Sequence, residues 1–152
     1  MWYLLSSASL VADRILKKKA REDRLPDLLT PGGSIEFHPI ENEGLAGSSL
    51  RRHPTLVKWL SCAALGVNIP ALLRGFRNQN RPAKCGIALL LTGSGSNIYD
   101  RLKNGSVTDM LRFPKAPGKL KTLVFNLADF MILLGALLTI LFSPCQAKRK
   151  KL

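Results

Sequence analysis

The acidic residues of this chain are unevenly placed, and the few in its second half are the first candidates for chemistry. Seven of the ten Asp and Glu residues precede Gly44, and only Asp100, Asp109 and Asp129 follow it. An aspartate within an apolar membrane segment costs about 2.5 to 3.5 kcal/mol on insertion scales, so it must face a cavity or a partner. We therefore treat these three carboxylates as candidates for function.

Two of the three aspartates follow an asparagine at the same spacing. Asn97 and Asn126 each precede an aspartate by three residues, at Asp100 and Asp129. On a helix, residues three apart share a face, so each pair would present its polar groups in one direction. Two carboxyl groups that meet share a proton, and one can act as a base on water while the other polarises a carbonyl. This is the arrangement of an aspartyl protease.

A simpler interpretation of these residues remains open. Asp100 could pair with Arg101 or another neighbouring base, and Asp109 could cap a short helix. Other catalytic machinery is not evident, because the sequence has no Ser/His/Asp set and no phosphate-binding G-x-x-x-x-G-K-[ST] motif. His38 and His53 lack the spacing of metal ligands and are interpreted as loop residues. We expect no metal and no organic cofactor.

Four apolar stretches must position these residues, at about 2–16, 56–73, 85–99 and 122–142. The last holds 21 residues with one charge, against the roughly 20 needed to cross a bilayer. The other three are shorter, so a soluble helical bundle is the alternative. If all four span, Asp13, Asp100, Asp109 and Asp129 lie near one level, with Asp129 about 10 Å from the outward end of its helix.

The third stretch is also rich in small residues, which would allow close helix approach. They are Gly86, Gly93, Ser94, Gly95 and Ser96. We expect an all-α membrane protein of four transmembrane helices, as a single domain over 1–152. A small, partly β extramembrane lobe at about 17–54 lies between the first and second helices, with a strand at Ile35 to Ile40 among Pro and Gly residues. An outward loop at about 101–121 joins the third and fourth helices.

The charge balance favours a lipid surface over nucleic acid. The chain has 23 Lys and Arg against 10 Asp and Glu, a net charge of +13. The basic residues lie mainly between apolar segments rather than interleaved with aromatic residues. Basic residues at 148–151 and 74–84 place both termini in the cytoplasm. The basic residues at 17–24 and 115–121 would then lie outside, against the rule that basic residues are enriched in cytoplasmic loops. There they could hold anionic headgroups.

Two further features concern the chain ends and the cysteines. Residues Ser7 to Ser9 resemble a signal-peptide cleavage site, but the charged region that should precede it is missing. Cys62, Cys85 and Cys145 are odd in number and lie in or beside apolar segments. We interpret them as buried thiols rather than a disulfide framework, with acylation of Cys145 as a possibility from its position.

The polar blocks resemble those of a known family. Asn97 to Arg101 (NIYDR), Val107 to Asp109 (VTD) and Phe125 to Asp129 (FNLAD) are similar to the signature blocks G-N-x-x-D-R, V-x-D-F and F-N-x-A-D of bacterial lipoprotein signal peptidases. Their order and spacing also fit. The resemblance implies that Asp109 and Asp129 are the catalytic pair. It implies that the site is ordered by Asn97, Asp100, Arg101 and Asn126.

The upstream match is thinner. Val11 to Asp13 resembles the family's D-Q block, and Glu41 to Ala46 resembles its R-N-T-G-A-A-F block, which adds three residues to the site: Asp13, Asn42 and Gly44. The sequence departs from the family pattern at Arg14 for Gln, Glu43 for Thr, Gly47 for Phe, Ser96 for Gly and Met110 for Phe. The first two would bring charge close to a lipid-binding groove and so affect the usual substrate.

The resemblance implies a membrane aspartyl endopeptidase that removes signal peptides from prolipoproteins, cleaving before a diacylglyceryl-modified cysteine. Its partners would be the lipidated prolipoprotein and membrane phospholipids, without nucleic acid, and we expect a monomer. It would be a multi-pass protein of the cell membrane with its site at the outward face. Two other functions stay open: an ion-coupled membrane transporter, since intramembrane Asp and Asn also mark ion paths, and a non-catalytic lipopeptide-binding relative.

Overall fold

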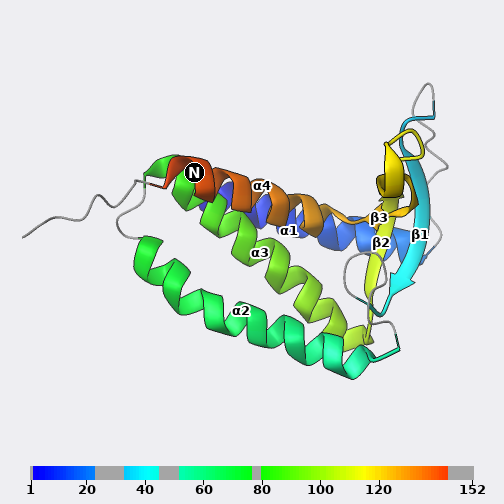
Figure 1. The fold of residues 1–152 in the computed structure, drawn as a ribbon, viewed down its shortest axis with the longest axis horizontal. Coiled ribbons are helices and arrows are strands. Elements are labelled where there is room, and N and C mark those ends of the chain that lie inside the picture. The colour runs from blue at the N-terminus through cyan, green and yellow to red at the C-terminus, as the bar shows by residue number, and fades with distance from the viewer. Residues whose placement is uncertain (1, 23–32, 45–51, 77–79, 144–152) are drawn as a thin grey trace, which may run out of the picture.

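A computed structural model describes residues 2–22, 33–44, 52–76 and 80–143. Within these residues four α-helices form an elongated bundle with a small sheet across one end (Figure 1). The helices are α1 (Trp2–Arg21), α2 (Pro54–Phe76), α3 (Arg81–Asn104) and α4 (Leu127–Phe142). The strands are β1 (Glu36–Asn42), β2 (Val107–Arg112) and β3 (Val124–Phe125), and the 3₁₀ helix η2 (Gly118–Thr122) precedes β3.

Helix α3 runs through the bundle between well-defined end signals. The side chain of Asn80 accepts a hydrogen bond from the Ala83 amide at 3.0 Å, which caps the first turn. Gly105 ends the helix in the left-handed region at φ 80°, a conformation that costs glycine little. The helix therefore continues past Asp100, which we had expected near its end, to Asn104.

Glycines bring α3 and α4 into close contact, as expected from the small residues of the third apolar stretch. A Cβ added at Gly93 would lie 2.6 Å from the Ala128 carbonyl oxygen, and one at Gly135 would lie 2.6 Å from the Gly86 oxygen. Gly95 differs, because a Cβ there would meet nothing within 4 Å. Only some of the small residues therefore contribute to the close packing.

Helix α4 is shorter than the fourth apolar stretch. That stretch was expected to be helical over 122–142, but α4 begins at Leu127 and has 16 residues. Asn126 is its N-cap in a capping box, in which the Asn126 and Asp129 side chains bond each other's backbone amides. The Asn126–Asp129 spacing is thus the signature of a helix start, and the prediction of a shared helix face was wrong for this pair.

The sheet joins two segments that are far apart in the sequence. Strand β2 is central, antiparallel to β1 and to β3. The β1–β2 register is irregular between Phe37 and Ile40, around Pro39, which cannot donate to a sheet ladder. The expected strand at 35–40 is confirmed as β1, but β2 lies in what was expected to be the outward loop 101–121, so Asp109 is a strand residue and not a helix cap.

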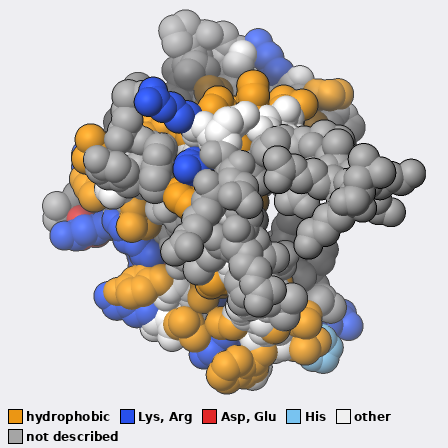
Figure 2. All heavy atoms as spheres, turned by 90° about the vertical axis from the view of Figure 1, so that its left-hand side faces the viewer, with side chains coloured by type: hydrophobic (Ala, Val, Ile, Leu, Met, Phe, Trp, Pro, Cys, Tyr) orange, Lys and Arg blue, Asp and Glu red, His pale blue; other side chains and the backbone are white. Residues whose placement is uncertain are grey.

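Many apolar side chains lie on the surface of the bundle. In Figure 2, which looks along the bundle from the end away from the sheet, the described side chains are mainly apolar, with scattered Lys and Arg. Apolar side chains also lie exposed along α4, including Leu133, Leu137 and Ile140. By a criterion of length and mean hydropathy, no helix in the described part of the chain qualifies as a membrane span.

The structure differs from two smaller expectations, which concern the histidines and the cysteines. His38 lies on β1 and His53 directly before α2, so only the second is a loop residue. Cys62 and Cys85 are free thiols that are partly exposed rather than buried. Cys145 and Gly47 lie outside the described residues.

The glycine contacts give a test of the α3–α4 packing. We expect Gly93→Ala to lower the free energy of unfolding by about 1 to 3 kcal/mol, because its methyl group must displace the backbone of α4. Gly95→Ala is the matched control on the same helix, and it should be neutral or stabilising by up to about 1 kcal/mol from helix propensity. Thermal unfolding of the two purified variants measures the difference. Equal midpoints would contradict the close α3–α4 contact.

Candidate active site

Asp109 lies on the central strand with both carboxylate oxygens bonded. Asn42 on β1 donates its side-chain amide to Asp109 Oδ2 at 2.8 Å, and Asn126 donates to Oδ1 at 2.6 Å. Asn42 pairs with Val107 in the sheet, two residues before Asp109, so the two side chains share one face of the sheet. The strand pairing therefore brings Asn42 to the carboxylate.

Asp129 is the third residue of α4 and is held by two other amides. Its Oδ2 accepts the Asn126 backbone N–H at 3.0 Å, and its Oδ1 accepts the Asn97 side-chain amide at 2.9 Å. Asn126 thus contacts both aspartates, one through its side chain and one through its backbone. This single residue, 1% exposed, sets the two carboxyl groups beside each other.

Both carboxyl groups line one pocket of about 330 Å³ at the junction of the sheet and α4. Asn42, Asn97 and Arg101 supply further polar groups, and the remaining lining is apolar: Val107, Leu123, Val124, Phe125, Ile132, Leu133 and Ala136. A concave, mostly apolar pocket with a few convergent polar groups is the usual form of a binding site.

The environment changes the acidity of Asp109. Burial raises the pKa of Asp109 from 3.8 to about 6, and the nearby Asp129 carboxylate adds to the rise. The hydrogen bonds from Asn42 and Asn126 oppose it, because they stabilise the charged form. A carboxyl group with this pKa can exchange a proton near neutral pH.

A buried cluster of charges contacts the side-chain oxygen of Asn97. Lys17, 1% exposed, places its Nζ 2.9 Å from Asp13 Oδ2 and 2.8 Å from Asp100 Oδ2. The same Nζ donates to Asn97 Oδ1 at 3.0 Å. Since that amide oxygen faces Lys17, the Asn97 NH₂ group is directed at Asp129. Lys17 therefore orients a direct contact of the carboxyl pair.

Asp13 links this cluster to the start of α4. It is fully buried, accepts from the Ser96 hydroxyl at 2.6 Å, and accepts from the Ala128 backbone N–H at 3.0 Å. The second contact satisfies an amide in the first turn of α4, which has no partner within the helix. Asp13 thus connects three helices one residue away from Asp129.

Arg101 holds the turn that follows β1. Its Nη2 donates to the Gly44 carbonyl at 2.9 Å, and the Gly44 amide donates to Asn42 Oδ1 at 2.9 Å. The oxygen and the NH₂ group of the Asn42 side-chain amide are therefore both hydrogen-bonded. These bonds fix the orientation of the NH₂ group that donates to Asp109. Among the described residues, the buried Nε of Arg101 has no hydrogen-bond partner, and Arg101 lines the pocket.

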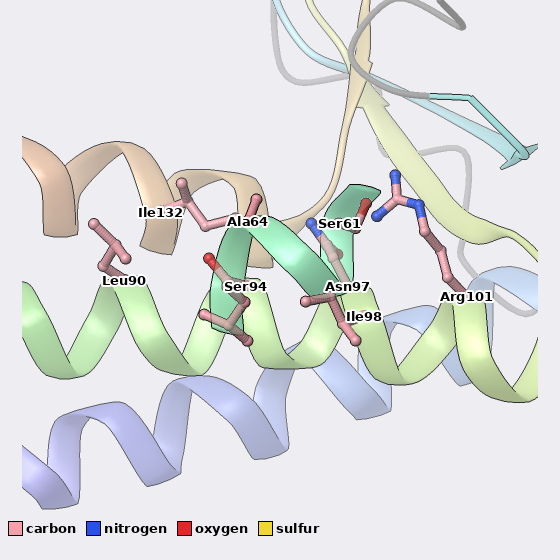
Figure 3. Close-up of a pocket in the computed structure, with 9 residues that line it drawn as sticks. Ser61, Ala64, Leu90, Ser94, Asn97, Ile98, Arg101 and Ile132 are labelled. Atoms are coloured by element: carbon pink, nitrogen blue, oxygen red, sulfur yellow. The ribbon is translucent and has the colours of Figure 1, made fainter. Parts of the chain in front are cut away.

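A second pocket adjoins the first along the bundle. It measures about 400 Å³ and lies between α2, which contributes Ser61 and Ala64, and α3 (Figure 3). Asn97, Arg101 and Ile132 line both pockets. The two pockets are therefore neighbours, and the second lies farther from the sheet, among the apolar side chains of α2 and α3.

Two departures from the family pattern bring charge near the site without lining its pockets. Arg14 donates to Asp100 at 2.6 Å and to the Ser96 carbonyl at 3.1 Å, and its guanidinium lies over the Tyr99 ring. It lines neither pocket of the carboxyl pair. Glu43 is exposed and lines neither pocket as well, although its neighbour Asn42 lines the pocket of the pair. An effect of these two charges on the substrate stays a prediction.

The structure brings most of the predicted residues together, in two groups. Asn42, Asn97, Arg101 and Asn126 contact the carboxyl pair or line its pocket, and Gly44 supports Asn42. Asp13 and Asp100 instead belong to the cluster around Lys17, so four carboxylates do not meet at one site. Asp100 pairs with Arg14 and Lys17 rather than with Arg101.

Sequence reasoning missed Lys17, which was assigned to the outward lobe. Its spacing from Asp13 is i to i+4, the arrangement of an ion pair on a helix, so the signal was available once α1 was extended past residue 16. Among the described residues, no group of three or more His, Cys, Asp or Glu side chains is placed to hold a metal ion.

The chain is similar in sequence to a known family over most of its length. A family model described as signal peptidase (SPase) II matches residues 5–144. Lipoprotein signal peptidases of Escherichia coli O157:H7 and Escherichia fergusonii are each 32% identical over 141 residues, covering 90% of this chain and 82% of theirs.

Two solved structures of bacterial membrane enzymes share the fold. The first has a TM-score of 0.75 at 19% identity and covers 92% of this chain and 85% of that chain. The second has a TM-score of 0.70 at 18% identity, with coverage of 92% and 90%. At these identities the likeness concerns the fold alone.

The contacts of Asp13 give a stability test. We expect Asp13→Asn to lower the free energy of unfolding by about 3 to 5 kcal/mol, because it removes one of the two carboxylates that compensate the buried Lys17. Glu43→Gln is the control, since it removes an exposed carboxylate that lies outside the cluster around Lys17. That change should stay within about 0.5 kcal/mol. Thermal unfolding of both variants decides whether the cluster holds the helices together.

Proposed function

The chain belongs to the signal peptidase II family, and from this premise we propose that Asp109 and Asp129 are the catalytic pair of an aspartic protease. The family assignment indicates a membrane protein of the bacterial cell membrane that removes signal peptides from prolipoproteins. The observation that carries the proposal is the bridge formed by Asn126, which bonds both carboxyl groups within one pocket.

The reaction needs one ionised and one protonated carboxyl group. The ionised group takes a proton from a water molecule, and the resulting hydroxide attacks the scissile carbonyl. The protonated group polarises that carbonyl and then supplies the proton that the leaving amine requires, so the pair ends with the same number of protons. The raised pKa of Asp109 favours a shared proton near neutral pH.

The surroundings of the pair support peptide binding. Arg101 lines the pocket of the pair, and its buried Nε–H has no acceptor among the described residues. An apolar pocket between α2 and α3 adjoins the pocket of the pair and shares lining residues with it. We propose that it receives the apolar part of the substrate, a signal peptide followed by a diacylglyceryl-modified cysteine. The family assignment does not favour transport or lipopeptide binding without cleavage.

We further propose that the sheet end of the molecule faces outward. The described parts of the lobe and of loop 101–121 lie together at one end of the bundle, with the carboxyl pair between them and the helices (Figure 1). This grouping supports a single outward face. We also propose that the protein is a monomer with four membrane spans.

The sidedness can be measured by labelling. Single cysteines at Ser34 and Ala116, in a variant without the three native cysteines, should react with a membrane-impermeant thiol reagent in intact cells. A cysteine at Lys148, in the basic tail, serves as the control and should react only after permeabilisation. Protection of either outer position in intact cells would contradict a common outward face.

The catalytic proposal predicts the effect of removing either carboxyl group. Asp109→Asn and Asp129→Asn should each abolish cleavage of a diacylated prolipoprotein, with a loss of at least about 10⁴-fold, because an amide can neither generate the nucleophile nor share a proton. Both should fold, because replacing a buried carboxylate with an amide removes a desolvation cost. Glu43→Gln removes a nearby exposed charge and should keep normal activity. A gel-shift assay measures cleavage, and near-normal cleavage by either Asn variant would contradict the aspartic mechanism.

The pH profile tests the contact between Asn42 and Asp109. The wild-type rate should fall at both pH extremes, reporting two apparent pKa values of the pair. The Asn42 hydrogen bond stabilises ionised Asp109 and so lowers its pKa. Asn42→Ala should therefore move the profile to higher pH, losing activity below the optimum more than above it, with a fall in kcat/KM of roughly tenfold at the optimum.

Asn104→Ala is the control for the pH experiment, since Asn104 is exposed and lines neither pocket of the pair. Its profile should match the wild type. An unshifted profile for Asn42→Ala would show that the Asn42 amide does not act on the carboxyl pair.

A further inference from the structure

A third pocket lies on the other side of α3 from the carboxyl pair. It measures about 370 Å³ and is formed by the last two turns of α1 and the end of α3. Its lining is strongly basic, with five cationic residues and one acidic one: Arg14, Lys17, Lys18, Arg21, Lys103 and Glu22. Tyr99 and Asn104 complete it, and it shares no lining residue with the two pockets of the active site.

The floor of this pocket is electrically balanced. Lys17 and Arg14 face the buried carboxylates of Asp13 and Asp100 at 2.6 to 2.9 Å. These four charges neutralise one another, and none of them is available to a ligand without breaking a buried ion pair.

The mouth of the pocket keeps an excess of positive charge. Lys18 is 77% exposed, and its nearest acid, Glu22, is 3.9 Å away, at the limit of a weak surface pair. Lys103 is exposed and lies 5.6 Å from the centre of the Tyr99 ring. The charge of Arg21 is compensated by Glu41, whose Oε1 lies 3.4 Å from Arg21 Nε. Among the described residues that line the mouth, Lys18 and Lys103 are thus accompanied by one glutamate, which leaves one positive charge in excess.

The mouth also offers hydrogen-bond donors. With the Asn104 amide oriented so that its oxygen faces Arg21, that oxygen accepts from both Nη atoms at 2.9 and 3.0 Å. The NH₂ group of Asn104 then faces acceptors of the protein. Two ammonium groups, those of Lys18 and Lys103, remain around one hollow, and they suit the oxygens of a phosphodiester, which carries one negative charge.

An apolar track leads away from this mouth along α1. Val11, Ile15, Lys18 and Glu22 follow one another at i, i+4, i+7 and i+11, so they form one stripe on the helix. Val11 is 57% and Ile15 50% exposed, and Val11 lies about 10 Å from Lys18 along the axis. Residues 2–12 of α1 carry no charged side chain, and all its charges come after them.

The direction of this track fits a lipid lying along the helix. The charged end of α1 adjoins the sheet, where Arg21 bonds Thr108 on β2 at 2.7 Å, and the apolar part runs into the bundle. Tyr99, 49% exposed, lies between the two parts, and such aromatic residues favour the boundary between headgroups and acyl chains.

From this geometry we propose that the α1–α3 pocket binds the headgroup of an anionic phospholipid, with an acyl chain against Val11 and Ile15. Lys18 and Lys103 hold the phosphodiester. The site serves to seat the protein in the membrane and is separate from the substrate pockets.

The test uses the full chain purified in detergent and three probes: dioleoyl phosphatidylglycerol, dioleoyl phosphatidylcholine and inorganic phosphate. Native mass spectrometry counts retained lipid, and the thermal unfolding midpoint gives a second readout. Phosphatidylglycerol should bind saturably, with one molecule retained, and should raise the midpoint. Phosphatidylcholine and inorganic phosphate should do neither at the same concentrations.

Two double variants separate a specific site from general electrostatic attraction. Lys18→Gln with Lys103→Gln should weaken phosphatidylglycerol binding at least about tenfold, since each basic residue near an anionic lipid contributes a factor of about five. Lys19→Gln with Lys119→Gln removes the same charge from exposed positions outside the pocket and should bind like the wild type. Both should cleave a diacylated substrate normally in detergent, which also shows that they fold.

Three results would overturn the proposal. Equal binding of phosphatidylcholine and phosphatidylglycerol would remove the role of charge. An equal loss in the two double variants would show non-specific attraction. Stabilisation by inorganic phosphate that equals that of the lipid would identify a free-anion site without a role for the acyl chain.

Discussion

The contacts of the buried Lys17 are the constraint on which the rest of the structure depends. A charged amine that is 1% exposed is tolerated only when oppositely charged groups surround it, because removing an ion from water costs several kcal/mol. Asp13 and Asp100 supply those groups from α1 and α3. Asp13 also accepts the Ala128 amide, so the same cluster fixes where α4 begins. The helices can therefore adopt few other registers without leaving a charge unpaired.

The position of the carboxyl pair follows from that arrangement through two asparagines. Asn97 accepts from Lys17 on one side and donates to Asp129 on the other. Asn126 caps α4 and donates to Asp109. Each amide uses its oxygen and its nitrogen on different partners, which fixes its orientation. Donors that are already oriented need little reorganisation during a reaction, and such preorganisation is a major source of catalytic power.

The sheet supplies Asp109 and Asn42 to the site. Asp109 comes from a strand and Asp129 from the first turn of a helix, so the pair exists only where β2 meets α4. Asn42 reaches Asp109 because β1 pairs with β2, and Arg101 holds the turn after β1. The charged end of α1 joins the same region from the other side, through Arg21. One end of the bundle thus carries both the proposed chemistry and the proposed lipid contact.

The sequence by itself determined the four helices and the strand at β1, and it supplied the candidate residues of the site, because apolar runs and the blocks NIYDR, VTD and FNLAD are local patterns. It did not determine that Asp109 lies on a strand, since the partner strand of β2 is more than 60 residues away, as the separation of Asn42 and Asp109 shows. Nor did it show that α4 starts at Leu127, because hydrophobicity continues from 122 onward and only a side-chain cap marks the start. The contacts of Lys17 and the ion pair between Arg14 and Asp100 also depended on the tertiary structure. The ion pairs of Arg14 and Lys17 with Asp100 join residues more than 80 positions apart, and only the folded chain brings such charges within contact distance.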